Sequence, residues 1–198
     1  MKFKKYFFSF LILIFSFGTS SSYSMAPDVF VQSTVNRASQ ILSSDISREM
    51  KIEKLKIIAE ETVDINGIGF YTLGSYRKTL NEEQKEKYKN IFKDYFLKSF
   101  SSRLAEYSNP EIQVNSKEKL SEKYTIVSST LVATKDRPEV KIEWRIYTKN
   151  PSNPLIRDLI IEGLSLARTQ KEEFASILNS NDGNILVLFD ALEKFISN

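Results

Sequence analysis

One stretch of the sequence resembles a catalytic motif: Gly163-x-Ser165-x-Ala167, which lies between an apolar segment and a helical one. The related pattern G-x-S-x-G places a nucleophilic serine on a tight turn between a strand and a helix. Such a serine needs a base to take its proton, and the chain contains no His. Lysine can replace histidine in this role, but the residue three positions on is Arg168. We therefore predict that Ser165 is the N-cap of a helix and that Gly163 supplies the preceding turn.

Two carboxylates in the preceding apolar segment suggest a second kind of chemistry. Asp158 and Glu162 alternate with Ile156 and Ile160 in a pattern that allows both acids to point inward. An apolar pocket would raise the pKa of such a carboxyl group and make it a general base. More often such an acid lies at a strand end or pairs with an arginine. An enzyme that uses Asp158 or Glu162 therefore remains an alternative.

Metal and cofactor chemistry has little support in the sequence. The absence of both His and Cys excludes the usual zinc sites and any disulfide framework. The nearest approach to a calcium loop is residues 179–184, "NSNDGN", which we interpret as a helix end with a C-cap glycine. The glycines of residues 63–80 do not have the spacing of a phosphate-binding loop. We expect no metal and no cofactor.

The N-terminus has the organisation of a secretory signal peptide. Three lysines within the first five residues precede an apolar run at residues 6–18 and a serine-rich stretch. The run is shorter than the roughly 20 residues of a spanning helix, so an uncleaved anchor is the weaker interpretation. Small residues at Ser22 and Ser24 predict cleavage before Met25. The expectation is a signal peptide at 1–24 and an exported, periplasmic protein.

Removal of the signal peptide changes the electrostatic character of the chain. Residues 1–24 carry three basic and no acidic groups, so 28 Lys and Arg against 25 Asp and Glu become 25 against 25. A nearly neutral protein lacks the usual electrostatic basis for binding nucleic acid. Residues 25–198 contain no linker or repeat, and their length suits one domain.

Hydrophobic periodicity predicts helices, then strands, then helices again. Amphipathic helices are expected at residues 27–45 and 48–61, a short helix capped by Asp64, and a helix from Asn81 to about Tyr107 that begins with a capping box to Gln84. Residues 111–115, 123–134, 139–150 and 155–163 read as antiparallel strands. Helices at residues 165–179 and 184–195 follow. The pattern predicts an α+β fold in which helices cover one face of a curved sheet of about four strands.

Two stretches of the chain resemble a known family. Residues 67–108, "GIGFYTLGSYRKTLNEEQKEKYKNIFKDYFLKSFSSRLAEYS", are similar to the L-G-x-Y motif and T-x-E-Q helix of the toluene-tolerance family, also called the MlaC family. Residues 157–178, "RDLIIEGLSLARTQKEEFASIL", resemble its D-x-x-x-E-G-[VI]-S-L turn and the helix after it. The chain departs from the family at Arg77, where an aromatic residue is common, and at residues 150–155, where Gly and Trp are common.

The resemblance implies an NTF2-like fold with an apolar cavity for the acyl chains of a phospholipid. It also implies a periplasmic shuttle that maintains outer-membrane lipid asymmetry. The implied partners are an outer-membrane lipoprotein complex and an inner-membrane ABC transporter with its MCE-domain ring. Hopanoids are an alternative cargo of the same fold. An envelope scaffold protein is a third class, which a densely packed interior would favour.

Lipid carriage requires an apolar lining, because exposing acyl chains to water costs about 0.8 kcal/mol per CH₂. The head group can stay in water, so we expect tolerance of head-group chemistry. Tyr76, Arg77 and Arg145 are candidates for phosphate contact. The predicted lipid-binding residues are large and apolar, and many such residues simply fill a core. They are Phe70, Leu73, Phe92, Phe96, Phe100, Ile126, Leu131, Ile142, Trp144, Ile146, Leu159 and Ile161.

Overall fold

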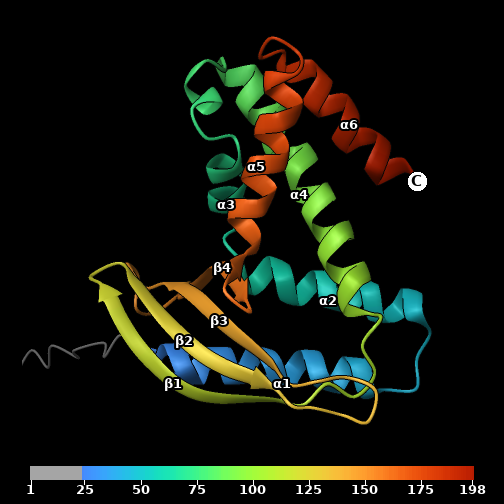
Figure 1. The fold of residues 1–198 in the computed structure, drawn as a ribbon, viewed down its shortest axis with the longest axis vertical. Coiled ribbons are helices and arrows are strands. Elements are labelled where there is room, and N and C mark those ends of the chain that lie inside the picture. Colours follow the sequence, from blue (N-terminus) through green and yellow to red (C-terminus); the bar gives the residue numbers. More distant parts are fainter. Residues whose placement is uncertain (1–23) are drawn as a thin grey trace, which may run out of the picture.

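The computed structural model describes residues 24–198, which form an α+β fold of six α-helices and a five-stranded antiparallel sheet (Figure 1). The α+β prediction is confirmed. Apart from Ser24, the predicted signal peptide lies outside the described residues. The helices are α1 Pro27–Ser43, α2 Arg48–Thr62, α3 Ile65–Thr72, α4 Glu82–Leu104, α5 Leu166–Asn179 and α6 Ile185–Ser197, with a 3-10 turn, η1, at Tyr76–Lys78.

The helix starts occur where the sequence supplies capping side chains. The Asp64 carboxylate accepts a hydrogen bond from Gly67 N at 2.9 Å and begins α3. Asn81 and Gln84 form the predicted capping box of α4, although the helix ends at Leu104 and does not reach Tyr107. Ser165 Oγ accepts a hydrogen bond from the backbone N of the third residue of α5 and is the N-cap of that helix, as predicted.

The sheet is a meander in the order β1-β2-β3-β4-β5, with every neighbouring pair antiparallel. Its strands are β1 Ile112–Ser121, β2 Tyr124–Leu131, β3 Val140–Tyr147, β4 Leu155–Ile161 and β5 Leu164–Ser165. Strand β1 is twice as long as predicted, because its second half is exposed and lacks the alternation by which a half-buried strand is recognised. Strand β5 has only two residues, too short for any periodicity.

The turn between β4 and β5 consists of two residues, Glu162 and Gly163. Both have positive φ, 49° and 81°, and Ile161 pairs with Leu164 across the turn. This is the conformation of a type I′ hairpin, which requires a left-handed backbone at both central positions and favours glycine at the second. Gly163 therefore supplies the turn, as predicted.

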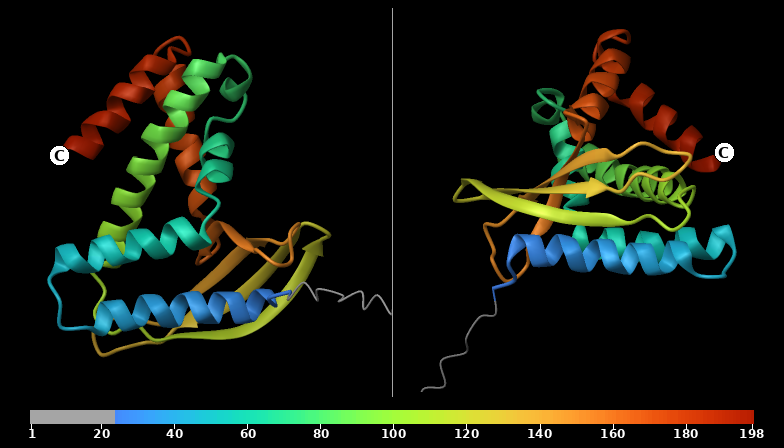
Figure 2. Two further views of the ribbon diagram at one scale, coloured as in Figure 1. Left: turned by 180° about the vertical axis from the view of Figure 1, so that it is seen from behind. Right: turned by 60° about the horizontal axis from the view of Figure 1, so that its bottom comes forward.

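The sheet has one buried face and one polar face. Ile142, Trp144 and Ile146 of β3 are buried, whereas Lys141 and Glu143, which alternate with them, are exposed. Helix α1 packs along β1 and β2, and α2 packs on α1 and α4; α5 rises from the end of β4, and α4 stands on α2 (Figure 2). The interior therefore has two parts, one between α1, α2 and the sheet and one between the upright helices.

Helices α3 and α4 pack at close range through Gly69. A Cβ atom at this glycine would lie 2.7 Å from Cδ1 of Phe92, which is nearer than side chains tolerate. One turn earlier on α4, the Tyr88 ring is almost completely buried, and its hydroxyl contacts Gly69 O at 3.0 Å and Thr72 Oγ1 at 2.9 Å. The missing side chain of Gly69 therefore allows α3 and α4 to approach closely.

Strand β4 joins the sheet to the helices through an irregularity in its pairing. Arg145 pairs with Asp158 and Ile146 pairs with Ile156, so Arg157 is an extra residue on β4. Its guanidinium donates to Asp64 Oδ2 at 2.6 Å. The same group lies 3.7 Å from the centroid of the Tyr147 ring, where the cation is attracted to the π face. One arginine thus connects the start of α3 to the sheet.

We expect Asp64→Ala to lower the free energy of unfolding by about 2–3 kcal/mol, because it removes a helix cap and the partner of a half-buried arginine. Urea denaturation of the two proteins measures this difference. The control is Asp28→Ala, which breaks an exposed pair with Lys117 and should cost about 1 kcal/mol or less. Equal losses in the two variants would contradict the anchoring role of Asp64.

Burial raises the pKa of the Tyr88 hydroxyl above its ordinary value. The folded state therefore holds this proton more tightly than the unfolded state, and stability should fall as the pH rises above about 10. In Tyr88→Phe the fall should be shallower, by up to about 1.4 kcal/mol per pH unit. Urea titrations between pH 8 and 11.5 test this, with the exposed Tyr71→Phe as control. Identical slopes for wild type and Tyr88→Phe would contradict it.

Candidate functional site

Two apolar cavities lie end to end inside the protein. The outer cavity, of about 200 Å³, is enclosed by α4, α5 and the β3–β4 part of the sheet. The inner cavity, of about 140 Å³, lies between α1, α2 and the sheet. Five residues line both cavities and form the wall between them: Val63, Phe100, Trp144, Ile156 and Leu159.

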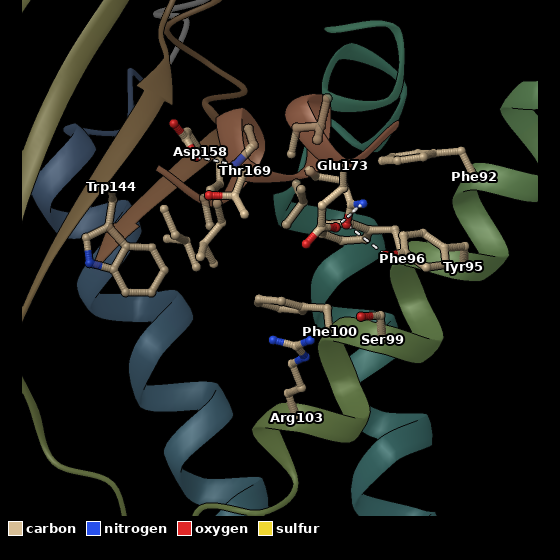
Figure 3. A pocket seen from close by; sticks show the side chains of 17 residues that line it. Phe92, Tyr95, Phe96, Ser99, Phe100, Arg103, Trp144, Asp158, Thr169 and Glu173 are labelled. Atoms are coloured by element: carbon tan, nitrogen blue, oxygen red, sulfur yellow. Dashed lines mark hydrogen bonds between the residues drawn. The ribbon is translucent and has the colours of Figure 1, made fainter. Parts of the chain in front are cut away.

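Three phenylalanines of α4 form one wall of the outer cavity (Figure 3). Phe92, Phe96 and Phe100 are spaced four residues apart, so they lie on one face of the helix. The rings of Phe92 and Phe96 are 6.2 Å apart, and those of Phe96 and Phe100 are 5.4 Å apart, both stacked. Such ring pairs are stabilised by their quadrupoles as well as by burial. The result is a continuous aromatic surface.

Trp144, the single tryptophan of the chain, faces both cavities from the sheet. Its indole Nε1 donates to Ser129 Oγ at 2.8 Å, and that hydroxyl in turn contacts Ile142 O at 3.2 Å. The polar atom of the indole is therefore satisfied within the sheet. The ring can present an apolar surface to the cavity without an unpaired donor.

Polar side chains gather at one end of the outer cavity, on the facing helices α4 and α5. Tyr95 donates its hydroxyl to Gln170 Oε1 at 2.7 Å, and Gln170 Nε2 donates to Glu173 Oε2 at 2.8 Å. Burial raises the pKa of Tyr95, and the Glu173 carboxylate raises it further. Arg103 and Ser99 of α4 also line this part of the cavity, which we call the polar mouth.

Asp158 is buried but already engaged as a hydrogen-bond acceptor. Its Oδ2 accepts from Ser165 Oγ at 2.6 Å and lies 3.6 Å from Arg145 Nη1, and its Oδ1 accepts from Ala167 N at 3.0 Å. These bonds hold the first turn of α5 against β4. Glu162 is exposed in the hairpin turn, where its Oε1 accepts from Lys141 N. Both carboxylates have structural partners.

Eight of the twelve predicted lipid-binding residues line the cavities. Phe92, Phe96, Phe100, Trp144 and Leu159 line the outer cavity, and Leu131, Ile142 and Ile161 join Phe100, Trp144 and Leu159 around the inner one.

The other four predicted residues lie elsewhere. Ile126 sits on the opposite face of β2 from Val127 and Leu131, because successive strand residues point to opposite sides. Ile146 lies on the buried face but has no exposed surface at all. Leu73 is buried in the core, and Phe70 packs against that core. These two residues of the α3 region line neither cavity.

The candidates for phosphate contact lie away from the polar mouth. Tyr76 donates to Asn179 Oδ1 at 2.6 Å, and Arg145 faces Asp158. Neither they nor Arg77 line either cavity. Sequence reasoning missed Arg103 and Glu173. The available signal for Arg103 was its spacing, since it is three residues beyond Phe100 on the same helix face.

Within residues 24–198, no helix has the length and apolar character needed to cross a membrane. The same part of the chain has no cluster of three acidic side chains arranged to hold a metal ion. The candidate site is the pair of apolar cavities with its polar mouth.

Known proteins resemble this chain in sequence and in fold. The model of the MlaC protein family matches residues 32–194. The intermembrane phospholipid transport system binding protein MlaC of Haemophilus influenzae is 26% identical over 137 residues, which are 63% of this chain and 59% of that protein. The match therefore spans less than two thirds of that relative.

A solved phospholipid-binding protein from Ralstonia solanacearum, determined in complex with a phospholipid, has the same fold, with a TM-score of 0.72 and 19% identity. The likeness covers 87% of this chain and 98% of the Ralstonia chain. The family match extends over most of the sequence and includes both stretches on which the resemblance was based. The chain belongs to the MlaC family.

Proposed function

We propose that this protein is a periplasmic phospholipid carrier. It takes the acyl chains of one lipid into the outer and inner cavities and leaves the head group at the polar mouth. In the envelope it moves lipid between an outer-membrane lipoprotein complex and an inner-membrane ABC transporter with its MCE-domain ring, which maintains outer-membrane lipid asymmetry. The mature carrier is residues 25–198, released from a signal peptide at 1–24.

The observation that carries this proposal is the apolar lining of two adjoining cavities, the outer of which is bordered by polar side chains of α4 and α5. Two acyl chains in water cost on the order of 20 kcal/mol, so a carrier must bury them in a lining about as apolar as the bilayer. The aromatic wall of α4 and the satisfied indole of Trp144 provide such a lining. The name of the Haemophilus relative and the bound phospholipid of the Ralstonia protein support the same cargo.

The cavities must join and widen when a lipid enters. At about 200 and 140 Å³, each is smaller than the roughly 300–1,000 Å³ of most ligand sites. Phe100 is one of the side chains between them, and it is only half-buried. Movement of this ring and of its neighbours on the shared wall would merge the two volumes into one site for acyl chains.

The other functions have less support. An enzyme acting through Asp158 or Glu162 would need a free carboxylate, whereas both acids accept hydrogen bonds from the protein itself. An envelope scaffold would need no lined cavity. A hopanoid carrier would use the same cavities, and the identity of the extracted lipid separates that cargo from a phospholipid.

Trp144 provides a direct test, because it is the single tryptophan and lines both cavities. Delipidated mature protein mixed with vesicles of phospholipid brominated on the acyl chains should lose most of its tryptophan fluorescence, since bromine quenches on contact. Vesicles of the same lipid without bromine serve as the control. Native mass spectrometry of the same samples should show one bound glycerophospholipid.

Three outcomes would contradict the proposal. Equal fluorescence with brominated and plain lipid would mean that acyl chains do not reach the cavities. Protein purified from a periplasm without any bound lipid would argue against a carrier and favour a scaffold. A bound hopanoid in place of a phospholipid would show that the protein carries lipid but that its cargo is not a phospholipid.

A cavity-filling substitution provides a second test. Leu159→Trp places a larger side chain in the wall shared by the cavities, and we expect bound phospholipid to fall several-fold. Ile126→Trp is the matched control, because Ile126 is on the opposite face of the sheet and lines neither cavity. Lipid per protein is measured by extraction and phosphate analysis. Equal loading of the two variants would place the acyl chains elsewhere.

A further inference from the structure

The polar mouth carries one positive and one negative side chain on facing helices. Arg103 projects from α4 and Glu173 from α5, and both line the outer cavity (Figure 3). Burial raises the pKa of Tyr95, Glu173 raises it further, and Arg103 opposes that effect. The two charges therefore lie within electrostatic reach of the same hydroxyl, on the rim where an emerging head group must pass.

Neither charge is neutralised by the protein. Within residues 24–198, the Arg103 guanidinium has no carboxylate within 4.0 Å, although eleven other ion pairs form. One oxygen of Glu173 accepts a hydrogen bond from Gln170, and its Oε1 has no hydrogen-bond partner in the same part of the chain. Gln170 is itself fixed by the Tyr95 hydroxyl. The carboxylate is thus held in place with one oxygen free.

We propose that the polar mouth selects a zwitterionic phospholipid whose head group ends in a primary ammonium, such as phosphatidylethanolamine. Arg103 binds the phosphate, since a guanidinium donates to phosphate oxygens in a fixed fork. Glu173 accepts hydrogen bonds from the ammonium group. This inference rests on the proposed function, because it assigns a lipid preference to the same cavity, and it replaces the expected tolerance of head groups.

The charge pattern favours this head group over an anionic one. Arg103 alone would accept the phosphate of any phospholipid. Glu173 adds an attraction for an ammonium group, which donates charge-assisted hydrogen bonds to the carboxylate, whereas the terminal hydroxyl groups of phosphatidylglycerol donate only neutral ones. Both side chains are exposed, so the preference should be that of a surface ion pair, about two- to five-fold, and should weaken at high salt.

Competition among head groups tests the assignment. Delipidated mature protein is incubated with vesicles that contain equal amounts of phosphatidylethanolamine, phosphatidylcholine and phosphatidylglycerol with identical acyl chains. The protein is then separated, and its lipid is extracted and quantified. We expect the ratio of phosphatidylethanolamine to phosphatidylglycerol bound to wild type to be about two- to five-fold higher than the ratio in the donor vesicles.

Glu173→Lys should reverse the preference toward phosphatidylglycerol, because the rim would then hold two cations. Glu172→Lys is the matched control, since it makes the same charge change one residue away on α5 and lines neither cavity. It should retain the wild-type ratio. Glu173→Gln should bring the ratio close to that of the donor vesicles.

Two results would overturn the inference but not the proposed function. In one, wild type is fully loaded with lipid, but its head groups occur in the same ratio as in the donor vesicles. In the other, Glu172→Lys and Glu173→Lys change the head-group ratio equally. Uptake of no lipid by any of these proteins would overturn the proposed function and the inference with it. Lipid occupancy and head-group ratio are separate readouts of the same sample, so the two failures are distinguishable.

Discussion

The extra residue in β4 is the constraint on which the rest of the architecture depends. A strand without it would turn Arg157 and Asp158 to opposite faces. With it, both side chains lie on the face that carries Arg145 and Tyr147, where one anchors the start of α3 and the other the start of α5. Two helices are thereby attached to adjacent residues of a single strand. The outer cavity is the space that this attachment leaves between α5 and α4.

Helices α4 and α5 supply both apolar and polar residues of the site. On α4, the face that carries Phe96 and Phe100 into the cavity also carries Arg103 to its rim. On α5, Ala167 lies against the cavity near Asp158, and Glu173 stands two turns further along. In the proposed carrier, the interior supplies affinity through non-directional burial, whereas the rim supplies discrimination through directional charge. Neither property requires a reactive group, which is consistent with a chain that has no His and no Cys.

Local chemistry made much of the fold and part of the site predictable from the sequence. The caps at Asp64, Asn81 and Ser165 depend on residues three positions away, and periodicity of 3.6 or 2 identified the long helices and most strands. Prediction from the sequence was weaker where tertiary structure determines the direction or the partners of a side chain. Ile126 looked like a lining residue because its hydrophobicity is visible in the sequence, whereas the face to which it points is set by the register of β2. The engagement of Asp158 also depends on the irregularity in β4, which no pattern in the sequence marks.

The two edges of the sheet have a consequence for the behaviour of the protein at high concentration. An open sheet has free backbone donors and acceptors at its edges, which are templates for aggregation. On one side, β5 pairs with Ile160 and Ile161 of β4, and Val63 forms a bridge to Ile156, so other segments of the chain occupy part of the β4 edge. On the other side, β1 is long and exposed, but it carries Lys117 and Lys119 and has two irregularities in its pairing with β2. Charge and distortion at such an edge oppose strand-to-strand association between copies. If the apolar interior opens to admit a lipid, as proposed, these edges should resist strand-mediated aggregation while it does so.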